Sequence, residues 1–156
     1  MRIFTIGHGV AAFAELSPLL ERHGVATIVD VRSEPWSRRA PDFSRRRLES
    51  LAAAAGFGYR WLGDALGGRP ADPSVLAEDG TPDPAAMASS PAFVGALEVL
   101  EELAAGGAIV LLCAEADPRR CHRSTLLAPA LAERGHEVAH LLHDGSVCAH
   151  HPRLGI

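Results

Sequence analysis

Residues 106–123, GGAIVLLCAEADPRRCHR, hold the clearest strand of the chain and its densest group of reactive side chains. Two glycines precede a continuous apolar run over 108–113, which is typical of a strand buried on both faces of a parallel sheet. The run ends at Cys113, and acidic, basic, thiol and imidazole groups crowd the segment that follows. A hydrophobic core has no need of this mixture, so the segment predicts a central strand followed by a reactive or ligand-binding site.

The rest of the chain alternates between strand-like and helix-like patterns. The other predicted strands cover residues 2–7, 25–32, 57–62 and 136–142. The predicted helices cover residues 11–23, 45–55, 91–105 and 120–134, and Pro129 is expected to kink the last of them. This alternation predicts an α/β fold with a three-layer, open, mostly parallel Rossmann-like sheet and helices on both faces.

The predicted sheet also indicates where a ligand would bind. In open α/β sheets, ligands lie beyond the carboxyl ends of the strands. His8, Arg32, Trp61 and Cys113 each stand at or just past the end of a predicted strand. We therefore expect these four side chains to converge on one edge of the sheet.

The chain length fits one domain over residues 1–156. Residues 63–90 are rich in Gly, Pro, Asp and Ser and predict a long loop excursion, with or without a short helix, that covers the site. An irregular tail is expected from residue 143 onward. Neither a membrane-length apolar run nor a signal-peptide pattern is visible, so we expect a cytoplasmic protein with no membrane association.

Composition narrows the possible partners. The net charge is −4, so bulk charge gives no reason to expect nucleic acid. The arginines of 38–47 stand among aromatic residues, and we expect them to form a solvated surface in preference to an RNA or DNA contact. Three cysteines in a chain without a signal peptide favour reduced thiols over a disulfide framework. A small anionic ligand is the expected partner. The sequence leaves the oligomeric state and any cofactor open.

One interpretation of the crowded segment is nucleophilic chemistry by Cys113. A thiol near the start of a helix and near arginines should have a lowered pKa, because both favour the thiolate. The spacing Cys113-x5-Arg119 also matches the phosphate-binding loop of cysteine phosphatases and is close to that of rhodanese-like sulfurtransferases. However, Pro118 has no amide to donate, and Glu115 would repel a bound oxyanion.

A second interpretation is metal binding by Cys113, Cys121 and His122, with His8 or His140 as a fourth ligand. The spacing Cys-x7-Cys-His matches no standard zinc pattern. Adjacent residues on a helix point about 100° apart, so Cys121 and His122 are not expected to share one ion. The sequence therefore predicts no structural metal site, while a single loosely held ion stays open.

A third interpretation is acid/base chemistry. Glu115 and His122 flank an arginine-rich turn, and such a pair moves protons while arginines hold an anion. Taken together, these patterns predict an enzyme that acts on a small anionic, phosphate- or nucleotide-like substrate. The predicted catalytic residues are Cys113, Glu115, His122 and Cys121, and the predicted substrate-binding residues are His8, Arg32, Arg38 and Arg123. The alternatives are a non-catalytic nucleic-acid- or metabolite-binding module and a metal-binding scaffold.

Five motifs occur in order between Thr5 and about Gly145: TIGHG, VDVRSEPWSRRAPDFSRRRL, YRWLGDALGGRP, LLCAEADPRRCHR and GHEVAHLLHDG. Together they strongly resemble the family called Domain of Unknown Function 488. The resemblance implies a single α/β domain and no known activity. It marks as matched polar positions the residues His8, Arg32, Arg38, Cys113, Glu115, Cys121, His122, Arg123 and His140, together with Gly67 and Gly68.

Overall fold

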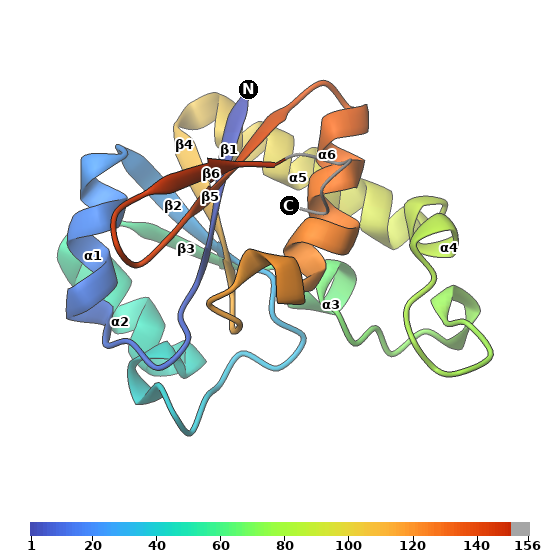
Figure 1. Cartoon of the computed structure of the whole chain (residues 1–156), viewed down its shortest axis with the longest axis horizontal. Helices are drawn as coiled ribbons and strands as arrows, with labels where there is room; N and C mark the ends of the chain where they lie inside the picture. The colour runs from blue at the N-terminus through green and yellow to red at the C-terminus, as the bar shows by residue number, and fades with distance from the viewer. Residues whose placement is uncertain (151–156) are drawn as a thin grey trace.

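A twisted sheet of six strands forms the centre of the molecule in the computed structural model, which describes residues 1–150 (Figure 1). The strand order is β3-β2-β4-β1-β5-β6. The first five strands run parallel, and β6 pairs antiparallel with β5. The strands are β1 (Arg2–Gly7), β2 (Val25–Asp30), β3 (Gly58–Trp61), β4 (Ala108–Cys113), β5 (Glu137–Leu141) and β6 (Val147–Ala149).

Helices cover both faces of this sheet, as Figure 1 shows. The helices are α1 (Phe13–Arg22), α2 (Arg45–Ala55), α3 (Gly63–Leu66), α4 (Pro84–Ala88), α5 (Pro91–Gly106) and α6 (Ala128–Glu133). Helices α1 and α2 bury their apolar sides with Phe4 and Ile6 on one face, and α5 and α6 pack with Ile3 and Val29 on the other. The predicted three-layer α/β fold is therefore confirmed. No helix within residues 1–150 combines the length and the apolar character needed to cross a membrane.

Strand β4 lies in the middle of the sheet, between β1 and β2. Residues Ile109 to Cys113 are at most 1% exposed, because helices cover the strand on both sides. Its apolar run has no alternation for this reason. The prediction of a central strand that ends at Cys113 is confirmed.

Two segments differ from the expected outline. Residues 63–90 form α3, a 3₁₀ turn over Pro73–Val75 and α4, and they bury Val75 and Met87 against the α5 side of the core. These helices are too short to give a periodic apolar pattern. In the expected irregular tail, β6 pairs with β5 after a turn at Gly145, whose φ of 89° favours glycine. The rest of that tail, 151–156, lies outside the described residues.

The predicted helix over 120–134 is divided into three parts. A 3₁₀ turn covers Pro118–Arg120, a π-helical turn covers Arg123–Leu127, and α6 follows. Pro129 stands in the first turn of α6 and has no N–H to close the preceding α-helical turn. The wider turn before it is consistent with the disturbance expected at this proline.

Candidate functional site

The four strand-end side chains meet at one edge of the sheet, as predicted. Gly7 of β1 is paired in register with Cys113 of β4, and the His8 N–H donates to the Cys113 carbonyl at 3.0 Å. Arg32 Nη1 lies 3.2 Å from His8 Nε2, and the indole of Trp61 donates to the Arg32 carbonyl at 2.8 Å. Arg32 and Cys113 line the same cavity. The convergence expected at the carboxyl ends of the strands is therefore present.

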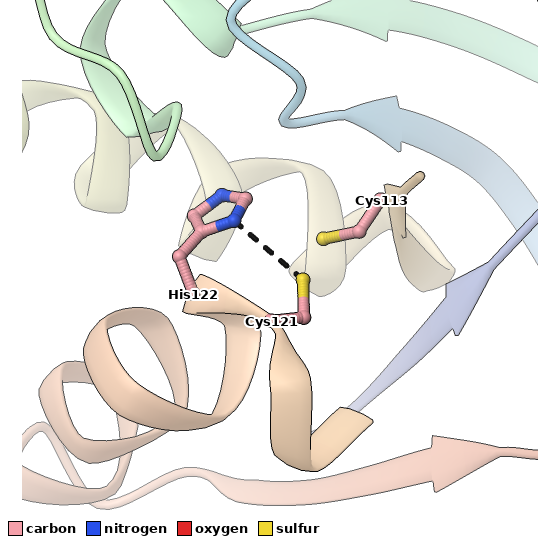
Figure 2. A group of neighbouring side chains, drawn as sticks. All are labelled: Cys113, Cys121 and His122. Atoms are coloured by element: carbon pink, nitrogen blue, oxygen red, sulfur yellow. Dashed lines mark hydrogen bonds between the residues drawn. The ribbon is translucent and has the colours of Figure 1, made fainter. Parts of the chain in front are cut away.

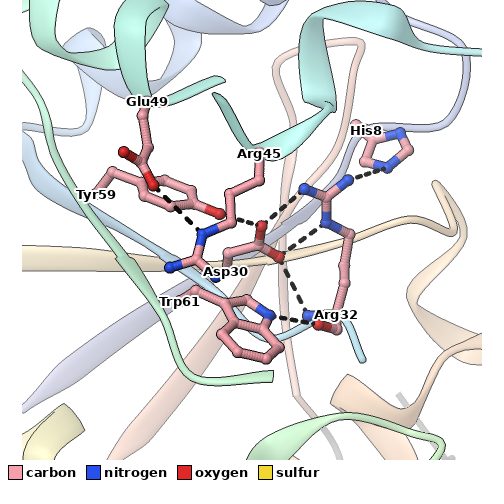
Figure 3. A network of polar contacts seen from close by, with 7 residues as sticks. All are labelled: His8, Asp30, Arg32, Arg45, Glu49, Tyr59 and Trp61. Atoms are coloured by element: carbon pink, nitrogen blue, oxygen red, sulfur yellow. Dashed lines mark hydrogen bonds and ion pairs between the residues drawn. The ribbon is translucent and has the colours of Figure 1, made fainter. Parts of the chain in front are cut away.

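A buried ion pair anchors this edge (Figure 3). Arg32 donates from Nε and Nη2 to the two carboxylate oxygens of Asp30, at 2.8 and 2.7 Å. Neither side chain is more than 4% exposed. The hydroxyl of Tyr59 donates to Asp30 at 2.5 Å, and burial together with the Asp30 charge raises the pKa of Tyr59, which keeps this donor protonated. The Asp30 carboxylate is therefore fixed by donors from two residues, Arg32 and Tyr59.

His8 is the other support of Arg32. Its Nδ1 donates to the Gly9 carbonyl at 2.9 Å, which leaves Nε2 free to accept from Arg32. The ring stacks on Phe43 with a centroid distance of 4.8 Å. Burial lowers the pKa of His8 to about 4, and the Arg32 charge acts in the same direction. His8 is thus a neutral positioning residue that also lines a cavity.

A second buried imidazole belongs to His140 on β5. Its Nδ1 lies 2.6 Å from Thr5 Oγ1, and its Nε2 lies 3.4 Å from Ser124 Oγ. Burial, followed by the nearby Arg123 charge, lowers the pKa of His140 to about 4. His140 is wholly buried and does not line the cavity next to Cys113.

We expect the free energy of unfolding to fall as the pH drops from 6.5 to about 4. His8 and His140 stay neutral over this range in the folded state, whereas they gain protons in the unfolded state. Each would remove about 1.4 kcal/mol per pH unit, and the loss should level off once the folded state also binds the protons. Urea unfolding across the range measures this slope. His140→Asn should halve it, and a flat profile would contradict the prediction.

A cavity of about 450 Å³ opens beyond the ends of β2 and β4, and we name it the strand-end cavity. Its walls include Arg32, Trp36, Arg69, Cys113, Glu115, Arg120, Cys121 and His122. Arg69 and Arg120 are exposed and form no ion pair within residues 1–150. The cavity therefore combines two available guanidinium groups with two thiols and an imidazole.

The two thiols and the imidazole form a compact cluster (Figure 2). The Sγ atoms of Cys113 and Cys121 and a ring nitrogen of His122 all lie within 4.8 Å of one another. Cys121 Sγ is 3.6 Å from His122 Nδ1. Cys121 is extended, with φ −132° and ψ 148°, and His122 then starts a helical turn. The expectation that a helix would separate these side chains is wrong, because Cys121 is not helical.

The protonation of the thiols also differs from the sequence expectation. Burial raises the pKa of the Cys113 thiol well above its usual value, and the Arg123 charge only partly opposes this. The pKa of Cys121 is lowered, because the Cys113 thiol donates a hydrogen bond to it and because His122 and the Arg123 backbone N–H lie close. The lowered pKa predicted for Cys113 is therefore wrong, and its neighbour Cys121 carries that property.

The predicted anion-binding arginines have different positions. Arg123 is wholly buried and donates from Nη2 to the Ala116 carbonyl at 2.8 Å, so it holds the loop after β4 in place from the core side. Its Nε and Nη1 have no hydrogen-bond partner within residues 1–150. Arg38 is exposed and lines neither the strand-end cavity nor a second cavity beside His8. Arg119 pairs with Asp117 at 3.2 Å instead of facing Cys113, which removes the likeness to a phosphatase loop.

Glu115 lies between two cavities. It lines the strand-end cavity and also a neighbouring cavity of about 510 Å³, whose walls include His8, Arg39 and His143. The Asp117 backbone N–H donates to the Glu115 carboxylate at 3.3 Å. Its carboxylate is exposed, so Glu115 occupies the position expected for a group that exchanges protons with a bound ligand.

Two of the five arginines in the basic cluster over 38–47 are paired with nearby acidic residues. Arg45 pairs with Glu49 and lies 4.9 Å above the ring of Trp61, and Arg47 pairs with Asp42 at 2.7 Å. These contacts agree with the expected solvated surface. Arg38, Arg39 and Arg46 are exposed and form no ion pair within residues 1–150.

Sequence reasoning missed Arg69 as a site residue. The family resemblance marks only the two glycines of its motif, LGGRP. Gly67 and Gly68 instead allow close packing: a Cβ on Gly67 would collide with Ser33, and one on Gly68 would lie 3.2 Å from the His122 ring. The Arg69 backbone N–H donates to Ser33 Oγ at 2.9 Å. The paired glycines before an arginine were the available signal.

Comparison with known proteins relates the chain to one family. No curated protein and no solved structure matches the chain. A family model described as domain of unknown function DUF488 matches residues 12–129, a range that contains Arg32, Arg69 and the Cys113–Cys121–His122 cluster. Because the match covers well over half of the sequence, the chain belongs to the DUF488 family.

Proposed function

We propose that the protein is an enzyme that acts on a small anionic, phosphate- or nucleotide-like substrate in the strand-end cavity. One observation carries the proposal: the guanidinium groups of Arg69 and Arg120, which have no ion-pair partner within residues 1–150, line the same cavity as the Cys113–Cys121–His122 cluster. Guanidinium groups hold phosphates and carboxylates through paired hydrogen bonds. An anion bound there would lie next to the reactive side chains.

The remaining polar residues would divide the work between binding and proton transfer. Arg32 is fixed by Asp30 and His8 and would present its remaining N–H groups to the anion. Glu115 would exchange protons with the substrate, because its carboxylate is exposed and borders the cavity. The cysteines and His122 would form the centre at which bonds change.

Trp36 supports a nucleotide-like substrate over a bare anion. It is 54% exposed and lines the cavity, so its indole offers a flat apolar face at the rim. Exposed aromatic rings stack on nucleobases and contribute about 1–3 kcal/mol per base. A nucleobase on Trp36 would leave the phosphate free to reach the arginines.

Titration calorimetry with inorganic phosphate and with a nucleoside monophosphate tests the binding step. Arg69→Ala and Arg120→Ala should each weaken both ligands about tenfold or more, because a hydrogen bond to a charged group contributes about 1.5–3 kcal/mol. Trp36→Ala should weaken only the nucleotide. Arg46→Ala, at an exposed position on α2 that lines neither cavity, is the matched control and should leave both affinities unchanged.

Turnover distinguishes an enzyme from a binding module. Mass spectrometry after incubation with a panel of nucleotides and phosphate esters should detect a converted substrate, with conversion at least tenfold slower in Glu115→Gln. Ligands that bind but stay chemically unchanged would make the chain a binding module. Binding of none of them, or affinities insensitive to Arg69 and Arg120, would contradict the proposal.

A further inference from the structure

Three soft donor atoms converge at the inner end of the strand-end cavity. They are the thiols of Cys113 and Cys121 and the Nδ1 atom of His122. Within residues 1–150, no other three His, Cys, Asp or Glu side chains bring their donor atoms close enough together to share one ion. Thiolate and imidazole ligands favour zinc over magnesium or calcium.

The spacing of these donors fits tetrahedral zinc. Zn–S bonds of about 2.3 Å and Zn–N bonds of about 2.0–2.1 Å at a tetrahedral angle separate sulfur and nitrogen by about 3.6 Å. Cys121 Sγ and His122 Nδ1 are 3.6 Å apart. The same geometry separates two sulfurs by about 3.8 Å. The three donors lie within 4.8 Å of one another, so a small side-chain adjustment completes the arrangement.

The backbone holds the three donors in place. Cys113 ends the central strand β4 and is 1% exposed, so its position is set by the sheet. The 3₁₀ turn over Pro118–Arg120 returns the chain to the same point, where the Cys121 N–H donates to the Pro118 carbonyl. Gly68 lies so close to the His122 ring that a Cβ added to it would be 3.2 Å away. A site with preset ligands binds a metal without a large loss of side-chain entropy.

Three protein ligands leave one position of a tetrahedron free. Cys113, Cys121 and His122 all line the strand-end cavity, so the fourth position would face the space beside Arg69 and Arg120. Structural zinc sites use four protein ligands, whereas catalytic sites keep a position for water or substrate. An ion here would therefore be of the second kind.

From this geometry we propose that Cys113, Cys121 and His122 bind one zinc ion whose fourth coordination position opens into the strand-end cavity. Binding forms two Zn–S bonds and one Zn–N bond and releases to solvent whatever protons the two sulfur atoms still carry. A zinc-bound water or substrate oxygen would lie beside Arg69 and Arg120. The catalytic role of the zinc ion, unlike its binding, rests on the function proposed above.

Cobalt(II) titration of the full chain after removal of metal by a chelator tests the site. We expect one cobalt per chain with the intense visible absorption of a tetrahedral thiolate complex, displaced by zinc. Cys121→Ser and His122→Ala should lower cobalt affinity at least a hundredfold, a larger loss than substitutions outside the ligand shell cause. Cys148→Ser, at a half-buried thiol on β6, is the matched control and should bind as the wild type does.

Cys113→Ser is a weaker test because the side chain is buried in the core, so circular dichroism must show that each variant is folded. Stoichiometric binding that survives in Cys121→Ser and His122→Ala would overturn the proposal, as would the pale spectrum of octahedral cobalt. If cobalt does not bind but phosphate still binds through Arg69 and Arg120, only the zinc site fails. If tetrahedral cobalt forms and no anion binds, only the proposed function fails.

Discussion

Replacing Asp30 by alanine is expected to lower the free energy of unfolding by about 3–5 kcal/mol, because it leaves a buried guanidinium group without its charged partner. Arg32 is 5% exposed, and both carboxylate oxygens of Asp30 accept from it. Without Asp30, the Arg32 charge would keep only the neutral His8 ring as a side-chain partner. Tyr59 would lose its acceptor as well. Urea unfolding monitored by tryptophan fluorescence and circular dichroism measures the loss.

A matched control separates burial from ion pairing as such. Glu49→Ala removes the Arg45–Glu49 pair, whose side chains are 47% and 51% exposed. An exposed pair of this kind contributes about 0.3–0.5 kcal/mol. A loss in Asp30→Ala no greater than that in Glu49→Ala would contradict the structural role given to the buried pair.

The second large effect is expected at the end of β1. A Cβ on Gly7 would overlap the carbonyl oxygen of Glu115 and would lie 2.6 Å from Arg123 Nη1. Gly7 is paired with Cys113, and the His8 N–H donates to the Cys113 carbonyl, so the strand cannot move aside. We expect Gly7→Ala to cost about 3 kcal/mol or more, at or above the usual upper range for overpacking.

The opposite sign is expected at Gly95, which makes it a useful control for Gly7→Ala. Gly95 lies within α5, and a Cβ there would have no atom within 4 Å. Alanine should stabilise the helix by about 0.5–1 kcal/mol, because glycine loses more backbone entropy on folding. Thermal unfolding of the two variants side by side measures both signs. A Gly7→Ala protein as stable as the wild type would contradict the close packing of β1 against the loop after β4.

Local patterns were sufficient to predict the architecture and the edge of the sheet at which His8, Arg32 and Cys113 come together. Continuous apolar runs identify parallel strands buried on both faces, and strand ends identify the ligand edge. His8, Arg32 and Cys113 were found in this way. Strand β6 was missed because Val147–Ala149 is an edge strand of only 3 residues, too short to give a recognisable pattern.

The parts of the site that could not be predicted depend on long-range packing. The convergence of Cys121 and His122 requires the backbone to change from extended to helical between them, which helical periodicity does not indicate. Arg69 reaches the cavity because Gly67 packs against Ser33, a contact between distant parts of the chain. The raised pKa of Cys113 follows from complete burial, whereas the sequence indicated only nearby arginines.

The pairing of Arg32 with Asp30 has a consequence for the evolution of ligand preference in such a protein. The charge on the innermost arginine of the cavity is cancelled within the core, so the electric field experienced by a ligand depends on exposed loop residues such as Arg69, Glu115 and Arg120. Loops accept substitution far more readily than a sheet does. Related proteins can therefore diverge in ligand preference through these loops while Asp30 and Arg32 keep the scaffold intact.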